Sequence, residues 1–366
     1  MNINRFSCEG APYEDDEFED AIGSEETFPE RKCLPLLRTP KHKKVIWKYI
    51  QDTIHMQYYK IQAPMNVYEP LSLLQRISEE MAYYKMLTDA DMIDDSCKRL
   101  AYVSAFVTSS YMNLKRITKP FNPIVGETFE LRFDELSLVL EQVNKDVTAL
   151  CCKHPNFVYW SSTELASQFV ENKLEISVLG PCYLYLIGSK QRYTWSRPSI
   201  TIKDLQSGRV KKEIEGEVRI TCDNSEEYSV IRFLKNSIEG EVFDGYKVIW
   251  RLKVGESIEI YNDNEKIALK EGNKYPDAYE YNYYFSLFAL QLNLPPFLFP
   301  GLPATDSRYR KDIRLFENGE FKQANKEYSA LMAKSEANKN YVPKWFQFNN
   351  NSWEFNEKYW EFRTSN

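Results

Sequence analysis

A lysine and an asparagine stand on a proline-rich turn, in the stretch KPFNPIVGETFEL that begins at Lys119. Pro120 and Pro123 fix φ and lack backbone N–H donors, so no regular helix passes through this stretch. Polar and apolar residues then alternate from 128 to 133, which is the period of a half-buried strand. The stretch therefore predicts a rigid turn at the rim of a sheet. It is either a plain connector or a support that holds Lys119 and Asn122 where an ammonium can bind a phosphate.

The rest of the chain shows no constellation that is typical of an enzyme or a metal site. Only three histidines are present, His42, His55 and His154, and none has metal-ligand spacing. No serine lies in a nucleophile elbow, and no glycine-rich phosphate loop occurs. The run from Cys152 to Pro155 brings a thiol near an imidazole, but neighbours on a strand point to opposite faces. We therefore expect no catalytic residue, no metal and no cofactor.

The composition is that of a globular protein with enough apolar residues for a large core or cavity. The chain has 366 residues, 43% of them hydrophobic, and a formal net charge of -6, which argues against a nucleic-acid partner. No apolar run is long enough to cross a bilayer, and the first residues lack a signal core. Seven scattered cysteines indicate neither a disulfide framework nor a zinc site. We therefore expect a reduced, cytoplasmic protein.

The N-terminal part is predicted to be irregular before it becomes helical. Residues 1–30 are rich in Asp and Glu and predict a disordered acidic arm. Leu34 and Pro35 follow, in a segment that could be a short linker. Helices are then expected at 45–54, from Pro70 onward, and after a cap at 94–96. Their apolar stripes are typical of a protein core.

The pattern changes to short β-rich runs from Glu127 to about Lys270. Turns separate these runs and no crossover helix intervenes, which indicates an antiparallel meander or barrel. After Tyr283 the pattern becomes helical again, with one helix expected at 321–334. We expect Asp306 to pair with Arg308 or Arg310. The tail carries spaced aromatic residues that either pack on the sheet or, for one or two of them, face a membrane.

The chain resembles the oxysterol-binding protein family of lipid carriers. The resemblance rests on the KPFNP turn and on blocks in the family's order that span about residues 34–363. These blocks are YEPLSLLQRISEEM (68–81), RLAYVSAFVTSSY (99–111), LPATDSRYRKDIRLFENGEF (302–321) and the tryptophan-rich tail (343–363).

The resemblance implies an α+β fold with a large, nearly closed antiparallel β-barrel around a lipid tunnel. The family pattern divides this chain into a lid and helices (31–118), a barrel (119–270) and a C-terminal region (271–366). Leu34 and Pro35 fall where apolar contacts of the lid would begin. Some of the helical core would then be tunnel wall.

The chain departs from the family at the site for the phosphatidylinositol 4-phosphate head group. The lysine of the turn is Lys119, with Asn122 beside it, and EQV of the fingerprint EQVSHHPP is intact at 141–143. The histidine pair becomes Lys145-Asp146; aligning it with Lys153-His154 instead needs an eight-residue insertion. A lysine, a glutamate and an arginine on the C-terminal helix become Tyr328, Met332 and Glu336. The family's usual phosphoinositide exchange is therefore doubtful.

The resemblance implies lipid binding and transfer, most simply of a sterol carried between membranes. The expected partners are a lipid, bound with Lys119, Asn122 and Lys145 near its head group, and membranes touched transiently from the cytoplasm. Two alternatives stay open. One is full exchange of sterol for phosphatidylinositol 4-phosphate, and the other is a carrier that has lost transfer and acts as an interaction or regulatory protein.

Overall fold

The computed structural model describes ten stretches of the chain. They are residues 31–38, 63–112, 115–171, 173–204, 210–235, 237–255, 257–271, 274–338, 340–349 and 352–365. The predicted acidic arm at 1–30, the predicted helix at 45–54 and the predicted lid beyond residue 38 lie outside these stretches.

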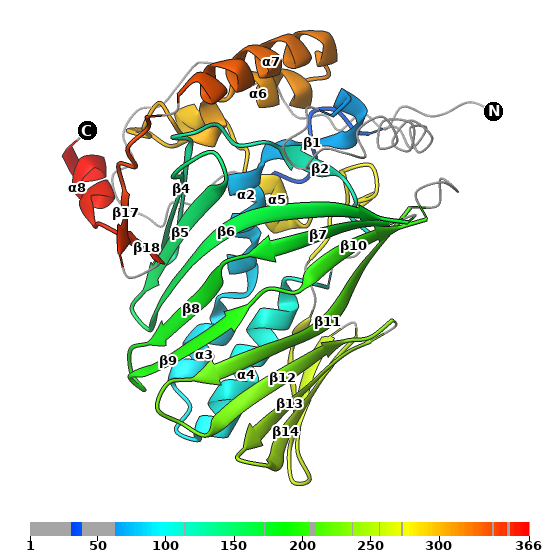
Figure 1. Ribbon diagram of the computed structural model, residues 1–366, viewed down its shortest axis with the longest axis vertical. Coiled ribbons are helices and arrows are strands. Elements are labelled where there is room, and N and C mark those ends of the chain that lie inside the picture. The colour runs from blue at the N-terminus through cyan, green and yellow to red at the C-terminus, as the bar shows by residue number, and fades with distance from the viewer. Residues whose placement is uncertain are drawn as a thin grey trace.

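The fold is dominated by one strongly curved, 14-stranded sheet whose neighbouring strands are antiparallel (Figure 1). Its edge strands are β3 and β16, so it is an incompletely closed barrel. This confirms the expected α+β fold with a large antiparallel sheet. The strands are β3 (Thr128–Phe133), β4 (Leu136–Gln142), β5 (Val147–His154), β6 (Phe157–Val170), β7 (Lys173–Leu179), β8 (Pro181–Leu186), β9 (Gln191–Ser196), β10 (Ser199–Lys203), β11 (Lys211–Cys222), β12 (Glu227–Phe233), β13 (Ile238–Asp244), β14 (Lys247–Val254), β15 (Ser257–Tyr261) and β16 (Lys266–Glu271).

Two long strands, β6 and β11, set the width of the sheet. One part of β6 pairs with β8 and the other with β7, while β11 pairs in the same way with β9 and β10. The chain passes from β7 to β8 at Gly180, which has a φ of +100°. A Cβ there would lie 2.2 Å from the carbonyl oxygen of Ser162 on β6, so this close approach requires glycine.

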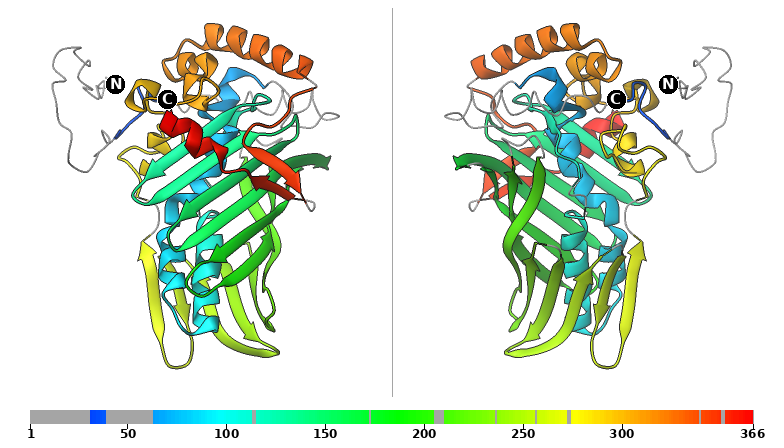
Figure 2. Two further views of the ribbon diagram at one scale, coloured as in Figure 1. Left: turned by 90° about the vertical axis from the view of Figure 1, so that its left-hand side faces the viewer. Right: turned by 90° about the vertical axis from the view of Figure 1, so that its right-hand side faces the viewer.

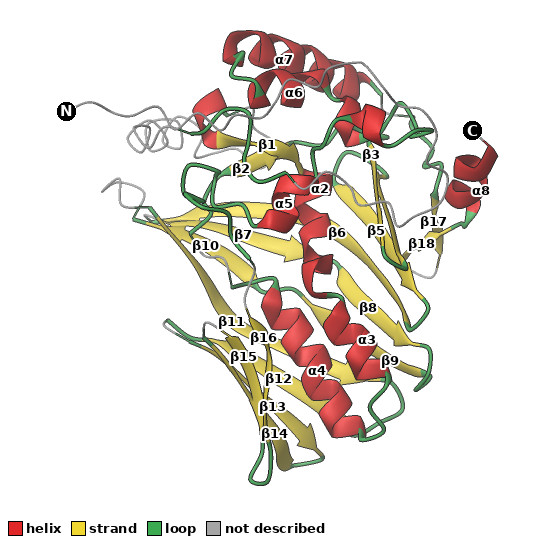
Figure 3. Ribbon diagram, turned by 180° about the vertical axis from the view of Figure 1, so that it is seen from behind, coloured by secondary structure: helices red, strands yellow, loops and turns green. Residues whose placement is uncertain are grey.

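Three helices lie against the concave face of the sheet, namely α2 (Leu73–Ser78), α3 (Lys85–Asp91) and α4 (Ser96–Ser109) (Figure 3). The predicted start at Pro70 is wrong, because that residue belongs to strand β1 (Tyr68–Ser72). Helix α2 starts after Ser72, which forms a capping box with Gln75. A 3₁₀ turn, η3 (Glu79–Tyr83), follows it. Asp95 caps α4, as the sequence predicts.

A second, smaller layer closes one end of the sheet. The short strand β2 (Lys119–Phe121) pairs in parallel with β1, and helices α6 (Lys311–Glu317) and α7 (Phe321–Ala337) lie above them (Figure 1). Helix α7 confirms the helix predicted at 321–334. Helix α5 (Leu287–Gln291) precedes this layer, together with the turns η4 (Pro296–Leu298) and η5 (Ser307–Tyr309).

Buried ion pairs hold the C-terminal segments on the sheet. Asp306 pairs with Arg308, as expected, with 3.7 Å between Oδ1 and Nε. Arg310 pairs with two other carboxylates, those of Glu127 (Nη1–Oε2 2.9 Å) and Asp312 (Nη2–Oδ2 2.6 Å). The last elements are β17 (Phe346–Asn349), β18 (Ser352–Phe355) and α8 (Lys358–Ser365), which lie beside β4 and β5 (Figure 2).

The aromatic tail mostly packs on the sheet. Trp345 and Tyr359 are buried in a cluster with Val139 and Ala149 of the sheet, whereas Phe348 is exposed. The packing role expected of the tail is confirmed for the first two of these side chains. A membrane contact of the exposed ones stays a prediction.

Candidate functional site

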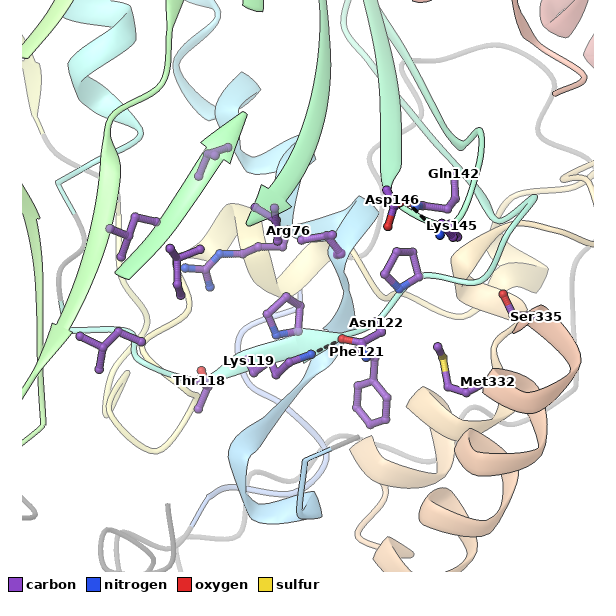
Figure 4. Close-up of a pocket in the computed structure, with 18 of the residues that line it drawn as sticks. Arg76, Thr118, Lys119, Phe121, Asn122, Gln142, Lys145, Asp146, Met332 and Ser335 are labelled. Carbon is purple, nitrogen blue, oxygen red and sulfur yellow. Dashed lines mark hydrogen bonds and ion pairs between the residues drawn. The ribbon is translucent and has the colours of Figure 1, made fainter. Parts of the chain in front are cut away.

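A cavity of about 400 Å³ lies between the concave face of the sheet, helix α2, the segment around β2 and helix α7 (Figure 4). Its size is within the range of small-molecule sites. Most of its wall is apolar and comes from alternate, inward-facing positions of neighbouring strands. The aliphatic residues and the methionine of this wall are Leu73, Ile117, Val125, Leu165, Ile176, Val178, Ile200, Ile202 and Met332.

The exposed end of this cavity, which we call the mouth, is polar. Lys119, Asn122 and Lys145, the three residues predicted to bind a head group, all line the cavity. Figure 4 shows Lys119 on β2 and Asn122 directly after it, with Lys145 in the loop between β4 and β5. Asp146 and Glu336 also line it, so the mouth combines lysines with carboxylates. The role of these residues in ligand binding stays a prediction.

Lys119 is held in a buried position by its neighbours. Its ammonium donates a hydrogen bond to Asn122 Oδ1 and lies 5.2 Å from the centre of the Tyr68 ring. Burial and the nearby Arg310 guanidinium lower the pKa of Lys119 to about 7. A bound anion would favour the ammonium form, so anion binding at the mouth should take up a proton near neutral pH.

Asn122 offers the mouth a further donor. The side chain is buried, with 6% of the residue exposed, and its Oδ1 accepts from Lys119 while its backbone carbonyl accepts from Arg310 at 2.7 Å. The amide nitrogen Nδ2 is buried and has no hydrogen-bond partner among the residues that the structure describes. A buried donor of this kind is satisfied when a ligand supplies an oxygen.

A second cavity of about 190 Å³ adjoins the first on its inner side. Its lining is more polar and includes Glu80, Tyr83, Tyr111 and Arg197. We call the surface that both cavities contact the shared wall. Its residues are Leu73, Arg76, Arg116, Leu165, Val178, Ile200 and Lys212.

An ion-pair network fixes Arg76 and Arg116, the two arginines of the shared wall. Glu69 on β1 is fully buried and binds Arg116 at 2.5 Å and Arg76 at 3.1 Å. Arg116 also binds Glu79 at 2.9 Å. Burial alone would raise the pKa of Glu69, but Arg116 and Arg76 outweigh it and lower that pKa to about 2. The carboxylate is therefore charged at neutral pH and fixes both guanidinium groups.

The charged residues of the shared wall were not predicted from the sequence. Arg76 and Arg116 lie far apart in the chain, and no local pattern joins them to Glu69. The inward orientation of Lys212 could have been predicted, because the apolar residues Ile214, Val218 and Ile220 of the same strand alternate with polar ones and are buried. Extending that alternation by two residues places Lys212 on the inward face.

Comparison with known proteins identifies the family to which this fold belongs. A family model described as "Oxysterol-binding protein" matches residues 45–364. The chain belongs to the oxysterol-binding protein family. It is 31% identical over 321 residues to human "Oxysterol-binding protein-related protein 3" and 28% identical over 374 residues to "Oxysterol-binding protein homolog 1" of Saccharomyces cerevisiae. These matches cover 82% and 87% of this chain but only 36% and 31% of the relatives, so the chain spans about a third of their length.

Solved structures of the oxysterol-binding protein family share the fold. A crystal structure of the "Osh1 ORD domain in complex with cholesterol" matches with a TM-score of 0.84 and 26% identity, covering 93% of each chain. The "Osh3 ORD in complex with PI(4)P from Saccharomyces cerevisiae" matches with a TM-score of 0.82 and 24% identity, covering 92% of this chain and 96% of that one. At 24% identity, the match to the Osh3 structure shows that the fold is shared and nothing more.

The structure favours one of the two ways to align the oxysterol-binding protein fingerprint. Lys145 and Asp146 lie at the mouth, in the turn after β4. Asn144 shapes this turn, because its Oδ1 accepts from the backbone N–H of Asp146 and Val147. The alternative residues, Lys153 and His154, lie at the far end of β5 and do not line the cavity. This position agrees with the alignment in which Lys145-Asp146 replaces the family's histidine pair, and that correspondence stays a prediction.

Helix α7 carries the other departures from the oxysterol-binding protein pattern. Met332 and Glu336 line the cavity, whereas Tyr328 is buried and its hydroxyl accepts a hydrogen bond of 3.3 Å from Tyr68. In the alignment predicted from the sequence, a thioether and a carboxylate thus replace two charged residues of the family pattern, and this correspondence stays a prediction.

Leu34 and Pro35 lie away from the cavity. Leu34 is buried in the main core and its backbone N–H donates to Asn282 Oδ1 at 2.9 Å. Pro35 is exposed, and neither residue lines the cavity. The described part of the predicted lid is thus attached to the C-terminal region through Leu34 and Asn282. Its function as a lid stays a prediction.

Proposed function

We propose that this chain binds one lipid in the cavity and transfers it between membranes. The observation that carries the proposal is the apolar cavity between the sheet and α2, open at a polar mouth. Burial of several hundred square ångströms of lipid surface, at about 25 cal/mol per Å², provides the driving force for loading. None of the described helices is long and apolar enough to cross a membrane. We infer that the protein contacts the membrane surface transiently while it takes up or releases the lipid.

Sterol is the first candidate for the cargo. The cavity wall is mainly aliphatic, and a relative of the same fold was solved in complex with cholesterol. A rigid ring system suits a wall of branched side chains, because little of its own conformational freedom is lost on binding. We infer a binding role rather than catalysis, and a cytoplasmic site of action at membrane surfaces. Among the described residues, no three His, Cys, Asp or Glu side chains are placed to share a metal ion.

Exchange for phosphatidylinositol 4-phosphate is the second candidate. Lys119, Asn122 and Lys145 at the mouth favour it. Asp146 and Glu336 oppose it, because they add negative charge beside a phosphate. Losing two charge-assisted contacts of about 1.5–3 kcal/mol each would lower the affinity by two or more orders of magnitude. We therefore expect sterol transfer without efficient phosphoinositide exchange.

The decisive experiment measures transfer of each lipid separately between donor and acceptor liposomes. A fluorescent sterol should move faster with the protein than without it, and phosphatidylinositol 4-phosphate in the acceptor should change that rate little. Strong competition between the two lipids would instead establish the exchanger. Transport of neither lipid would contradict the proposal and favour the interaction or regulatory role.

Residual binding of phosphatidylinositol 4-phosphate should depend on pH through Lys119. Its pKa of about 7 means that raising the pH from 7 to 8.5 removes the ammonium from the empty mouth, while the phosphate remains a dianion. The affinity should fall roughly tenfold over this range. The variant Lys119→Met should bind more weakly at pH 7 and lose most of this dependence, measured by liposome flotation.

A matched control for this prediction is Lys322→Met, which removes an exposed lysine of α7 that does not line the cavity. This variant should keep the wild-type affinity and pH profile. An unchanged profile in Lys119→Met would show that the lysine does not contact the head group.

A further inference from the structure

The cavity mouth carries charges of both signs. Its lining includes the cations Lys119 on β2 and Lys145 in the loop between β4 and β5, and the carboxylates of Asp146 in that loop and Glu336 in the last turn of α7. A ligand with a single sign of charge would be attracted by some of these groups and repelled by others. The mouth therefore suits a ligand that itself carries one positive and one negative charge.

Lys119 and Asn122 form the part of the mouth that suits an anion. The Lys119 ammonium donates to the Asn122 side chain, and Figure 4 shows the two side chains pointing toward one another. Because an ammonium can only donate, this contact identifies the amide oxygen and leaves Nδ2 as the other end. Nδ2 is buried and has no hydrogen-bond partner among the described residues, although the side chain lines the cavity. An oxygen of a phosphate can accept from both the ammonium and the amide.

Glu336 forms the part of the mouth that suits a cation. It is exposed and lines the cavity, as does Met332 four residues earlier, so this face of α7 is turned to the mouth. The residue between α7 and the mouth that fixes this turn is Ser335, which is buried and whose hydroxyl accepts from the backbone N–H of Val125 at 2.9 Å. The last turn of α7 is thereby attached to the segment after Asn122. The carboxylate and the anion-binding donors thus belong to one mouth.

Lys145 and Asp146 add one charge of each sign beside these two parts. Lys145 Nζ lies 3.9 Å from Asp146 Oδ2, and the lysine side chain is 82% exposed. An incoming anion is attracted by the first and repelled by the second, so the pair contributes little to the choice between head groups. That choice depends on Lys119, Asn122 and Glu336.

Phospholipid head groups differ in how well they match this arrangement. A phosphomonoester brings up to two negative charges towards Asp146 and Glu336. A serine head group adds a carboxylate, which Glu336 repels. A choline head group carries both signs, but its quaternary nitrogen has no N–H to donate. An ethanolamine head group combines a phosphodiester anion with a primary ammonium that has three N–H donors, so it matches both parts of the mouth.

We propose that the mouth binds the phosphoethanolamine head group of a phospholipid. A phosphate oxygen accepts from the Lys119 ammonium and from Asn122 Nδ2, while the ammonium of the ligand donates to the Glu336 carboxylate. The acyl chain lies along the aliphatic wall of the cavity. This inference rests on the proposed lipid-binding function and adds a second cargo, which competes with sterol for the same cavity.

The test compares myristoyl lysophospholipids that share the chain and the phosphate and differ only in the head group. Calorimetry on the full chain at pH 7, below the micelle concentrations, should show the ethanolamine lipid bound about fivefold more tightly than the choline lipid, as expected for an ion pair at a partly exposed site. The serine lipid should also bind more weakly than the ethanolamine lipid. Equal affinities for the three lipids in the wild-type protein would overturn the proposal.

Glu336→Gln should abolish the preference for ethanolamine over choline and leave the affinity for the choline lipid unchanged. The matched control is Glu320→Gln, which alters an exposed glutamate at the other end of α7 that does not line the cavity. This control should keep the wild-type preference. A preference that survives in Glu336→Gln would contradict the role of the carboxylate.

Lys119→Met tests the phosphate side separately. It should lower the affinity for the ethanolamine and choline lipids alike by about tenfold, because both carry the phosphate. The affinity for monomyristoylglycerol, which lacks the phosphate, should not change. No loss for the two phospholipids, or an equal loss for all three lipids, would contradict the phosphate site.

A head group without a chain distinguishes a lipid from a soluble ligand. sn-Glycero-3-phosphoethanolamine should not displace the ethanolamine lipid at equal concentration, because it cannot use the aliphatic wall. Displacement would show that the soluble head group, and not the lipid, is the occupant. Binding of sterol and monomyristoylglycerol without any head-group preference would contradict this inference alone. Failure to bind any of these lipids would contradict the lipid-binding function itself.

Discussion

Replacing Val178 by tryptophan is expected to reduce lipid loading and transfer at least tenfold. Val178 lies on β7 in the shared wall, where it lines both cavities. An indole there would occupy the space between the aliphatic strands in which we propose that the lipid binds. Because the side chain enters a cavity rather than a filled core, the folded state should lose little stability. Loading is measured as lipid retained after incubation with liposomes, and transfer by the fluorescent-sterol assay.

The next residue of the same strand provides the control for this substitution. Leu179 is 45% exposed and points to the outer face of the sheet. Leu179→Trp therefore adds the same indole without entering the cavity, and it should load and transfer lipid like wild type. Normal loading by Val178→Trp, with both variants folded, would show that the lipid does not occupy this cavity.

The largest loss of stability is expected for Glu69→Gln. Glu69 is fully buried and holds Arg116 at 2.5 Å and Arg76 at 3.1 Å, so its removal leaves buried positive charge without compensation. Breaking a buried ion pair in this way costs about 3–5 kcal/mol of unfolding free energy. The measurement is equilibrium urea denaturation at pH 7.

The pH dependence of stability gives an independent check on Glu69. Its folded pKa of about 2 lies below the ordinary glutamate pKa of 4.5, so the carboxyl group binds protons more readily in the unfolded chain. Its contribution is complete above about pH 4.5 and is lost as the pH falls towards 2. The stability of Glu69→Gln should therefore fall less steeply with acid than that of wild type.

An exposed ion pair serves as the comparison. Glu241 lies 2.6 Å from Arg232 on the sheet surface, where both side chains are partly exposed. Glu241→Gln should cost no more than about 1 kcal/mol, because water compensates for the lost partner. A similar small cost for Glu69→Gln would mean that the network behind the shared wall does not stabilise the fold.

Local patterns predicted much of this structure. The alternation after Glu127 indicates an antiparallel sheet, which the structure confirms. The prolines exclude a helix around Lys119, but the predicted turn is wrong for Lys119 itself, because Lys119–Phe121 forms strand β2 and the turn follows at 125–126. Lys119 and Asn122 nevertheless both line the cavity. Such signals depend on residues close together in the chain, so they can be read directly. The start of α2 was predicted wrongly because a proline is compatible both with the first turn of a helix and with a strand. The capping box formed by Ser72 and Gln75 places the start after Ser72.

The charged parts of the site were not predictable in the same way. Glu69, Arg76 and Arg116 become a network only when β1, α2 and the segment before β2 meet, and no residue spacing encodes that meeting. Lys212 was overlooked because a single lysine at a strand end is common on protein surfaces. Whether Lys212 lines the cavity depends on which face of β11 is turned to it. The positions of Ile200 and Ile202 on the neighbouring strand β10 show which face that is.

The hydrogen bond between Tyr68 and Tyr328 joins residues 260 positions apart and has a consequence for biosynthesis. At about 5–20 residues per second, a ribosome needs roughly ten to fifty seconds to make the chain between them. The strands of the sheet are made after β1 and before α7, so the concave face that they form has no cover above the mouth until α7 follows. We expect the nascent chain to present this apolar concavity to chaperones before it can hold a lipid.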